Sequence, residues 1–254
     1  MRIPQQTLEV EFFIYGGLVL TDEQVIAIHS FMSELRRDLG LRPDQSVKFS
    51  SHARPEHVRF EDWTAAKRAI LQELLRLEVR FMAYAVHHSI AAGQSVQRRN
   101  EFALNTILWG FHKLLEEVHD HGMVTVDEPD LEGRIVIGNL LNRGLEIDGR
   151  EVRLPRIVSY GRSHVDWTHC LSACDVLLGS FRYCVNHPDR AASAEMFPVV
   201  ARLLHHRERD GVAYIREHGL FLRPLQVRVD GIRRRYDNLT RNLETLLSER
   251  QANR

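Results

Sequence analysis

The chain has 254 residues, of which 44% are hydrophobic and 27% are charged, a composition typical of a globular protein with a sizeable core. Lysine and arginine number 34, as do aspartate and glutamate, so the formal net charge is zero. That balance excludes binding of nucleic acid or anionic lipid through overall charge and leaves only local patches for it. No run approaches the roughly 18–20 apolar residues that a membrane helix needs, and the first residues, MRIPQQTLEV, lack a signal-peptide pattern.

The N-terminal third alternates between strand and helix patterns. Residues 8–20, LEVEFFIYGGLVL, are rich in β-forming side chains and predict a strand. Thr21 is placed to cap a helix that ends at Gly40, because acidic residues follow it and apolar residues then recur at helical spacing. A short strand is expected at 47–49, within a polar stretch, and a helix over about 61–76.

The middle of the chain continues this alternation. The expected elements are a strand at 77–88, a helix over about 97–119, a strand at 122–127, a helix over roughly 132–145, a strand at 152–161 and a helix from about 167 to 185. Alternating strands and helices predict a three-layer α/β domain with a mixed sheet. The stretch NHPDRAAS at 186–193 marks an expected boundary, beyond which the chain is expected to be helical to its end.

Cysteine and histidine content favours neither a disulfide framework nor a zinc site. The cysteines, Cys170, Cys174 and Cys184, are three in number and lack a CxxC spacing, which is typical of reduced thiols in a cytoplasmic protein. The 14 histidines include two adjacent pairs, but neighbouring side chains diverge on a helix or a strand, and no HExxH is present. We therefore interpret them as scattered surface or hydrogen-bonded histidines.

A carboxylate ends the expected strand at 122–127. Asp127 and Glu128 directly follow the apolar run MVTV, and Pro129 comes next. Charge is costly inside a sheet, so either the strand stops there in water or these carboxylates hold something. The ends of strands are where α/β proteins collect reactive groups, which makes Asp127 a candidate site residue.

A second candidate lies on the helix expected from about 167 to 185. At about 100° per residue, Asp175 falls on the edge of the apolar stripe of this helix. Ser172 and Gly179 lie on the same side and are small, so another element can approach the carboxylate closely. An acid at such a boundary is either paired with a cation, for which Arg182 is the candidate, or shares a metal ion. The residues alone leave both alternatives open.

Four segments, in this order, resemble the family called domain of unknown function 3800, whose members are similar to ribonuclease H. The segments are EFFIYGGLVL, SVKFS, VTVDE and HCLSACDVLLGSFRY, and the similarity runs from about residue 8 to 190. The resemblance implies a ribonuclease H-like mixed sheet flanked by helices in a domain at 1–190, with a C-terminal helical extension at 191–254.

The same resemblance implies an active site. Asp127 and Asp175 would be the metal ligands for Mg²⁺ or Mn²⁺, and Lys48 and Glu128 would be further catalytic residues. In sites of this kind carboxylates hold one or two metal ions, which activate a water and stabilise the charge that builds on a phosphodiester.

Two acids of the family pattern are missing from this chain. The family opens with a strand bearing Asp-Glu-Ser-Gly, which has no counterpart before residue 8, and Ser46 stands where a Glu usually lies two residues before the Lys. Glu9 and Glu11, on an adjacent expected strand, are the candidates to replace the absent acids. The missing strand would lie between 8–20 and 122–127. These strands must therefore pair directly, or a segment from elsewhere must fill the gap, or the natural protein begins upstream of Met1, which is our expectation.

The C-terminal region carries a heptad pattern. Its apolar positions are spaced alternately by four and three residues and comprise Leu225, Val229, Ile232, Tyr236, Leu239, Leu243 and Leu246. This pattern is typical either of a helix that docks on its own domain or of a homodimer seam. The arginines at 233–235, with Arg228 and Arg241, form the most basic stretch and could contact phosphates.

Two functions follow from these patterns. The first is metal-dependent hydrolysis of phosphodiester bonds in nucleic acid, by a ribonuclease H-like nuclease. The alternative is a catalytically silent ribonuclease H-like module that binds a protein partner or nucleic acid through its C-terminal helix. A nucleotide-binding enzyme or an acyl transferase finds no support, because GxGxxG, GxxxxGK[ST] and GxSxG motifs are all absent.

Overall fold

A mixed three-stranded sheet forms the centre of the molecule. The computed structural model describes residues 11–127, 137–140, 142–147, 150–210 and 212–248. Strand β1 (Phe12–Val19) pairs antiparallel with β2 (Arg80–His87), and β2 pairs in parallel with β9 (Leu220–Leu222). Residues 81–86 of β2 are all buried, as expected for a strand that is covered on both faces.

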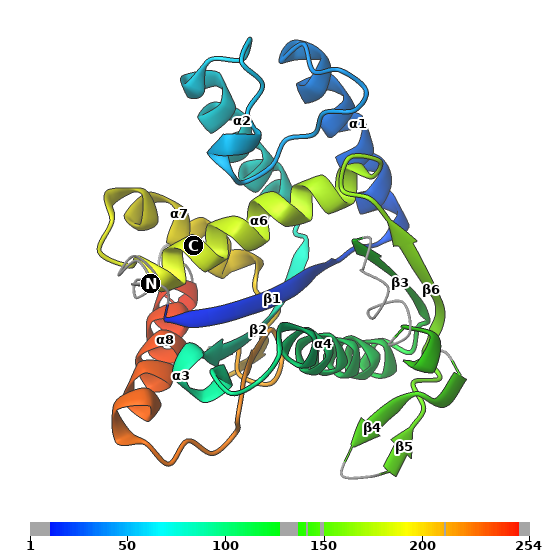
Figure 1. Cartoon of the computed structure of the whole chain (residues 1–254), viewed down its shortest axis with the longest axis vertical. Coiled ribbons are helices and arrows are strands. Elements are labelled where there is room, and N and C mark those ends of the chain that lie inside the picture. Colours follow the sequence, from blue (N-terminus) through cyan, green and yellow to red (C-terminus); the bar gives the residue numbers. More distant parts are fainter. Residues whose placement is uncertain (1–10, 128–136, 141, 148–149, 211, 249–254) are drawn as a thin grey trace, which may run out of the picture.

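Helices cover the two faces of β1. Helix α6 (His169–Asn186) lies along one side of the strand and α4 (Val96–Glu117) along the other (Figure 1). Successive side chains of a strand point to opposite faces, so Phe12 and Ile14 enter the large core that contains α6, while Phe13 and Tyr15 pack with buried Ala103 of α4. The α/β layering expected from the sequence is therefore confirmed.

Four more helices pack into the same large core as α6. They are α1 (Asp22–Asp38), α2 (Phe60–Arg76), α7 (Ala191–Leu203) and α8 (Asp230–Ser248), with short helical turns η2 (Ser51–Ala53) and α3 (His88–Ala91) between longer elements. Thr21 caps α1 as predicted, since its hydroxyl accepts from the Gln24 N–H while the Gln24 side chain accepts from the Thr21 N–H.

A second, parallel strand pair packs against another face of α4. Strand β3 (Gly122–Asp127) pairs with β6 (Ile157–Ser163), and Val124 and Tyr160 pack against Leu108 and Leu115 of α4. Two small hairpins complete the described strands: β4 (Leu145–Ile147) with β5 (Arg150–Val152), and β7 (Arg207–Arg209) with β8 (Val212–Tyr214). Helix α4 thus joins the central sheet to the β3–β6 pair.

Strands β1 and β3 belong to different sheets. Within the described ranges, β1 has β2 as its strand partner and β3 has β6. Direct pairing of 8–20 with 122–127, one of the three arrangements considered for closing the sheet, is therefore not observed there.

Side chains of α6 approach the outer edge of β1. The His88 N–H donates to the Glu11 carbonyl on the β2 side, so the backbone groups of Phe12 and of every second residue after it point away from β2. The buried Asn186 carboxamide takes the place of a neighbouring strand at Phe12, accepting from its N–H at 2.8 Å and donating to its carbonyl at 3.3 Å. Further along this edge, the backbone of Leu18 hydrogen-bonds to Cys174.

Three local predictions need correction. The expected strand at 47–49 is irregular backbone, because its polar groups bond to side chains of neighbouring helices. The helix expected over 132–145 falls partly outside the described residues, and Leu145 already begins β4. The region beyond 190 is not helical throughout, since β7, β8 and β9 lie within it.

Residues of the region 191–248 pack into the same hydrophobic core as the residues that precede it. Strand β9 extends the central sheet, and α7 and α8 bury side chains in the same cluster as α6. The boundary expected after residue 190 falls between two helices, α6 and α7, that pack on each other.

The heptad positions of the tail do not form one exposed stripe. Tyr236, Leu239 and Leu243 are buried within the chain, whereas Leu225 and Val229 are exposed and precede α8. This arrangement matches the alternative of a helix docked on its own domain, and the three buried residues are unavailable to a dimer seam. Two arginines of the basic stretch are already paired, Arg233 with Asp230 and Arg235 with Glu11.

Among the helices that the structure describes, none is long and apolar enough to cross a membrane.

The hydroxyl of Tyr236 fastens α8 to the sheet, and its removal tests that role. It accepts from the His87 N–H and donates to the Arg223 carbonyl, both at 2.8 Å, while the ring is 1% exposed. Tyr236→Phe leaves both backbone groups without this partner, so we expect the free energy of unfolding to fall by about 1–3 kcal/mol. Urea denaturation measures this loss. Tyr214→Phe, at an exposed position on β8, is the matched control, and an unchanged midpoint for Tyr236→Phe would contradict the assignment.

Candidate functional site

The segment 46–49 crosses α6 at its small residues. The Ser172 hydroxyl donates to the Val47 carbonyl at 2.6 Å. A Cβ atom on Gly179 would lie only 2.3 Å from the ring of Phe49, so glycine is what lets the segment come this close. The prediction that Ser172 and Gly179 admit another element beside Asp175 is confirmed.

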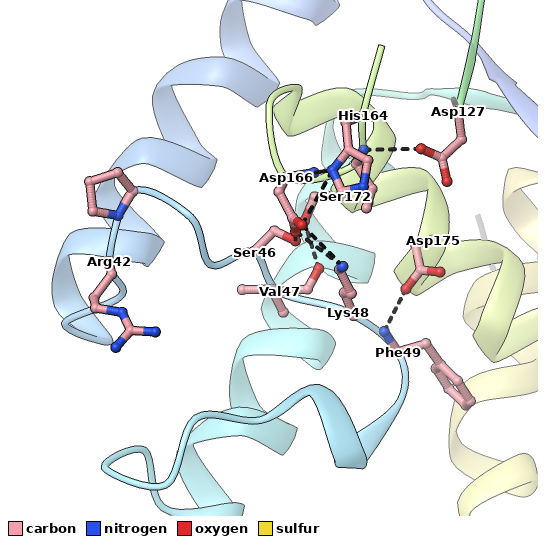
Figure 2. Close-up of polar contacts among 12 residues, drawn as sticks. Arg42, Ser46, Val47, Lys48, Phe49, Asp127, His164, Asp166, Ser172 and Asp175 are labelled. Carbon is pink, nitrogen blue, oxygen red and sulfur yellow. Dashed lines mark hydrogen bonds and ion pairs between the residues drawn. The ribbon is translucent and has the colours of Figure 1, made fainter. Parts of the chain in front are cut away.

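The carboxylate of Asp175 holds this segment in place. Its Oδ2 atom accepts from the Phe49 N–H at 2.7 Å (Figure 2). Lys67 Nζ donates to the Phe49 carbonyl at 3.1 Å. The observed partner of Asp175 is thus a backbone amide, and not Arg182 as the pairing alternative had it. This contact uses one of the two carboxylate oxygens.

Asp127 performs a comparable task at the end of β3. Its Oδ1 atom accepts from the Val165 N–H at 3.0 Å, which ties the end of the strand to the loop 164–168 between β6 and α6. The side chain is exposed, in keeping with a strand that ends in charge. Glu128, the other acid predicted here, lies outside the described residues.

A third carboxylate, Asp166, meets Lys48. The Lys48 Nζ atom lies 3.1 Å from Asp166 Oδ1, and the Ser46 hydroxyl donates to the same carboxylate (Figure 2). His164 Nδ1 lies 3.3 Å from Asp166 Oδ2. Ser46 stands where the family pattern has an acid. The loop before α6 brings the carboxylate of Asp166 to this position.

The sequence patterns did not predict Asp166 as a site residue, because helix and strand periodicity gives no position for a side chain in a loop. The available signal was its position: three residues before a helix, between His164 and Trp167, in the loop that follows a strand from the same sheet as Asp127. Loops at strand ends carry functional residues more often than other segments do, and that rule would have marked it as a candidate.

The surroundings of Asp166 favour its charged form. Partial burial acts to raise the pKa of this carboxyl group, but hydrogen bonds from Ser46 and Lys48, the positive charge of Lys48 and the electrostatic influence of His164 outweigh it. The net pKa of Asp166 lies below its ordinary value.

Asp127 and Asp175 both act on one thiol. Burial raises the pKa of Cys174 to about 12, and the carboxylates of Asp175 and Asp127 add to that rise. Burial likewise raises the pKa of Tyr15 to about 12, with Cys174 and Asp127 contributing. The strand-end acid and the helix-borne acid therefore both lie close enough to Cys174 to raise its pKa. The carboxylate separation needed for a shared metal ion stays a prediction.

The donor set is chemically suited to a hard divalent cation but is incomplete. Mg²⁺ prefers oxygen ligands and is often bound through one or two carboxylates while it keeps several waters. Asp127 and Asp175 supply such oxygens. In the part of the chain that the structure describes, no group of three His, Cys, Asp or Glu side chains is arranged to hold a metal ion.

No family model matches the chain, and searches of the curated proteins and of the solved structures return no significant match. Membership of the family called domain of unknown function 3800 therefore stays a prediction that rests on the four sequence segments.

The lowered pKa of Asp166 predicts a stability that depends on pH. A carboxyl group whose pKa is lower in the folded state stabilises that state above its unfolded value, about 3.9, and loses this contribution as pH falls through the folded value. At pH 6 we expect Asp166→Asn to lower the free energy of unfolding by about 1 kcal/mol, because the ion pair with Lys48 is lost. The difference should begin to shrink as pH falls below about 3.9 and should vanish below the lowered pKa of the folded Asp166 carboxyl group, where both chains are neutral at this position.

Urea midpoints of the two chains at pH 6 and pH 3 provide this comparison. Asp44→Asn removes an exposed carboxylate from an ion pair with Arg42 and serves as the control. A difference between the Asp166→Asn and unmodified chains that persists unchanged at pH 3 would show that charge at Asp166 is not its cause.

Proposed function

We propose that this chain hydrolyses phosphodiester bonds of nucleic acid with the help of Mg²⁺ or Mn²⁺, with Asp127 and Asp175 as the metal ligands. The observation that carries the proposal is the placement of the two acids. One ends a parallel strand and the other lies on the helix that follows the neighbouring strand, and both influence the same thiol. Ends of strands in α/β proteins are the usual place for such sites.

The proposal includes a ribonuclease H-like fold. An antiparallel pair, β1 and β2, followed by a parallel pair, β3 and β6, with helices between them, supports a ribonuclease H-like arrangement. The match of SVKFS, VTVDE and HCLSACDVLLGSFRY to this order of elements supports it further.

Each site residue has a role that its contacts suggest. A bound divalent ion would supply an activated water and would stabilise the charge that builds on the phosphate. Asp127 and Asp175 would hold that ion while each keeps its backbone N–H partner. Lys48, held by Asp166, is the cation available to a non-bridging phosphate oxygen, and Glu128 is a further acid that the resemblance implies.

The alternative function is binding without cleavage. It is favoured by the contacts of Asp127 and Asp175, since each carboxylate accepts from a backbone N–H. These bonds hold the loop 164–168 and the segment 46–49 in place without a metal ion. A silent module would keep these contacts for stability, and would bind nucleic acid or a protein partner through surfaces such as α8.

Replacing each acid by its amide separates the two functions. Asn has nearly the volume of Asp and can still accept from the Val165 or Phe49 N–H, but it carries no charge. If the chain is a nuclease, we expect Asp127→Asn and Asp175→Asn each to lower Mg²⁺-dependent cleavage of single-stranded or double-stranded DNA or RNA by at least about 100-fold, because each variant removes a charged ligand. Gel analysis of labelled substrates measures the cleavage, and circular dichroism checks the fold.

Asp189→Asn, in the loop between α6 and α7, is the matched control and should cleave at the unmodified rate. Undiminished cleavage by Asp127→Asn would remove that residue from the mechanism. No cleavage of any of these substrates by the unmodified chain with Mg²⁺ or Mn²⁺ would favour the silent module.

A further inference from the structure

An exposed tryptophan, Trp167, directly follows Asp166 in the loop 164–168. The side chain of Trp167 is 78% exposed, the largest exposure among the large hydrophobic residues that the structure describes. An indole ring in water leaves apolar surface uncovered, and most of that surface would be removed from water by a flat partner.

The loop that carries Trp167 is held from several sides. The Trp167 N–H donates to the His164 carbonyl at 2.9 Å and closes a turn. One residue before Trp167, Asp166 is bound by Ser46 and Lys48, and two residues before it the Val165 N–H is bound by Asp127. The backbone that presents the indole is thus fixed to the proposed site and not to a separate part of the surface.

Ring contacts link the indole to the charged groups. The ring centroids of Trp167 and His164 lie 5.5 Å apart, with an angle of 50° between the planes. His164 contacts Asp166, and Asp166 contacts Lys48. An exposed aromatic ring with a cation nearby, here Lys48, is the combination that binds single-stranded nucleic acid, in which a base stacks on the ring while the cation contacts the backbone.

We infer that Trp167 is a stacking platform for an unpaired base of single-stranded nucleic acid. The inference rests on the proposed function, since the backbone next to that base would pass Lys48 and the acids. A base in a duplex offers no free face, so a single strand, or a base turned out of a duplex, is the substrate class that this residue favours.

Equilibrium binding of a labelled oligothymidylate, in buffer with EDTA, tests the inference without cleavage. We expect Trp167→Ala to weaken binding by about 5- to 100-fold, the range that loss of one stacked base produces, and Trp167→Phe to weaken it much less, since a phenyl ring still stacks. Phe102→Ala removes an aromatic ring that is 47% exposed on α4, and as the control it should leave affinity within about twofold. An abasic oligonucleotide of equal length should bind the unmodified chain and Trp167→Ala equally.

A spectroscopic readout distinguishes stacking from a structural role. Bound oligothymidylate should quench indole emission in the unmodified chain, and most of that quenching should disappear in Trp167→Phe although binding is retained. The other tryptophans, Trp63 and Trp109, lie in the interior or pack against α4 neighbours and would keep their emission.

The outcomes separate this inference from the nuclease proposal. Stacking without any metal-dependent cleavage would support the inference and would overturn the nuclease proposal. Equal affinity of Trp167→Ala and the unmodified chain, or equal losses for the thymidylate and abasic strands, would overturn the inference whether or not cleavage occurs. Failure of the unmodified chain to bind any oligonucleotide would also overturn it.

Discussion

Helix α6 supplies side-chain hydrogen-bond partners to backbone groups that pair with no strand in the described part of the chain, and the arrangement of the molecule depends on these bonds. Asn186 bonds to both backbone groups of Phe12, Ser172 to the Val47 carbonyl, and Asp175 to the Phe49 N–H. An unpaired buried backbone group costs about 1–3 kcal/mol, so the four bonds hold β1 and the segment 46–49 on the helix. Because the small residues of α6 face the same segment, close approach and hydrogen bonding reinforce each other.

The carboxylates of the proposed site likewise bind backbone through side-chain hydrogen bonds. Asp175 and Asp127 each fix a neighbouring stretch of backbone, and Asp166 joins the loop before α6 to Ser46 and Lys48. Three stretches that are far apart in the chain, 46–49, 164–168 and the end of β3, therefore meet through carboxylates. Their charges would repel one another without a nearby cation, and Lys48 reduces that repulsion at Asp166. A divalent ion would serve the same purpose between Asp127 and Asp175.

Local sequence patterns predicted features that depend on one helix or strand. They did not predict contacts between segments that lie far apart in the sequence. The cap at Thr21, the end of β3 at Asp127 and the small residues at 172 and 179 were all readable, because each depends on neighbours within one element. The segment 47–49 looked like a strand, since its apolar residues alternate, but the partner that decides its conformation is a helix about 125 residues further along. Asp166 was missed for the same reason, because its partners Ser46 and Lys48 lie on another element. The heptad pattern of the tail is typical both of a docked helix and of a dimer seam, and the fold shows that Tyr236 and Leu243 face the chain's own core.

The pairing of β2 with β9 sets an order on the assembly of this chain. Ala83 lies opposite Leu220, and the Phe81 carbonyl accepts from the His205 N–H, so one edge of the innermost strand receives its partners from the last fifth of the sequence. During synthesis, β1 and β2 can pair before the C-terminal region exists, but the second edge of β2 stays open until β9 has left the ribosome. An open edge strand with a long apolar run, here residues 81–86, is a template for pairing with other chains, so the interval before β9 is synthesised is the time of greatest exposure to aggregation.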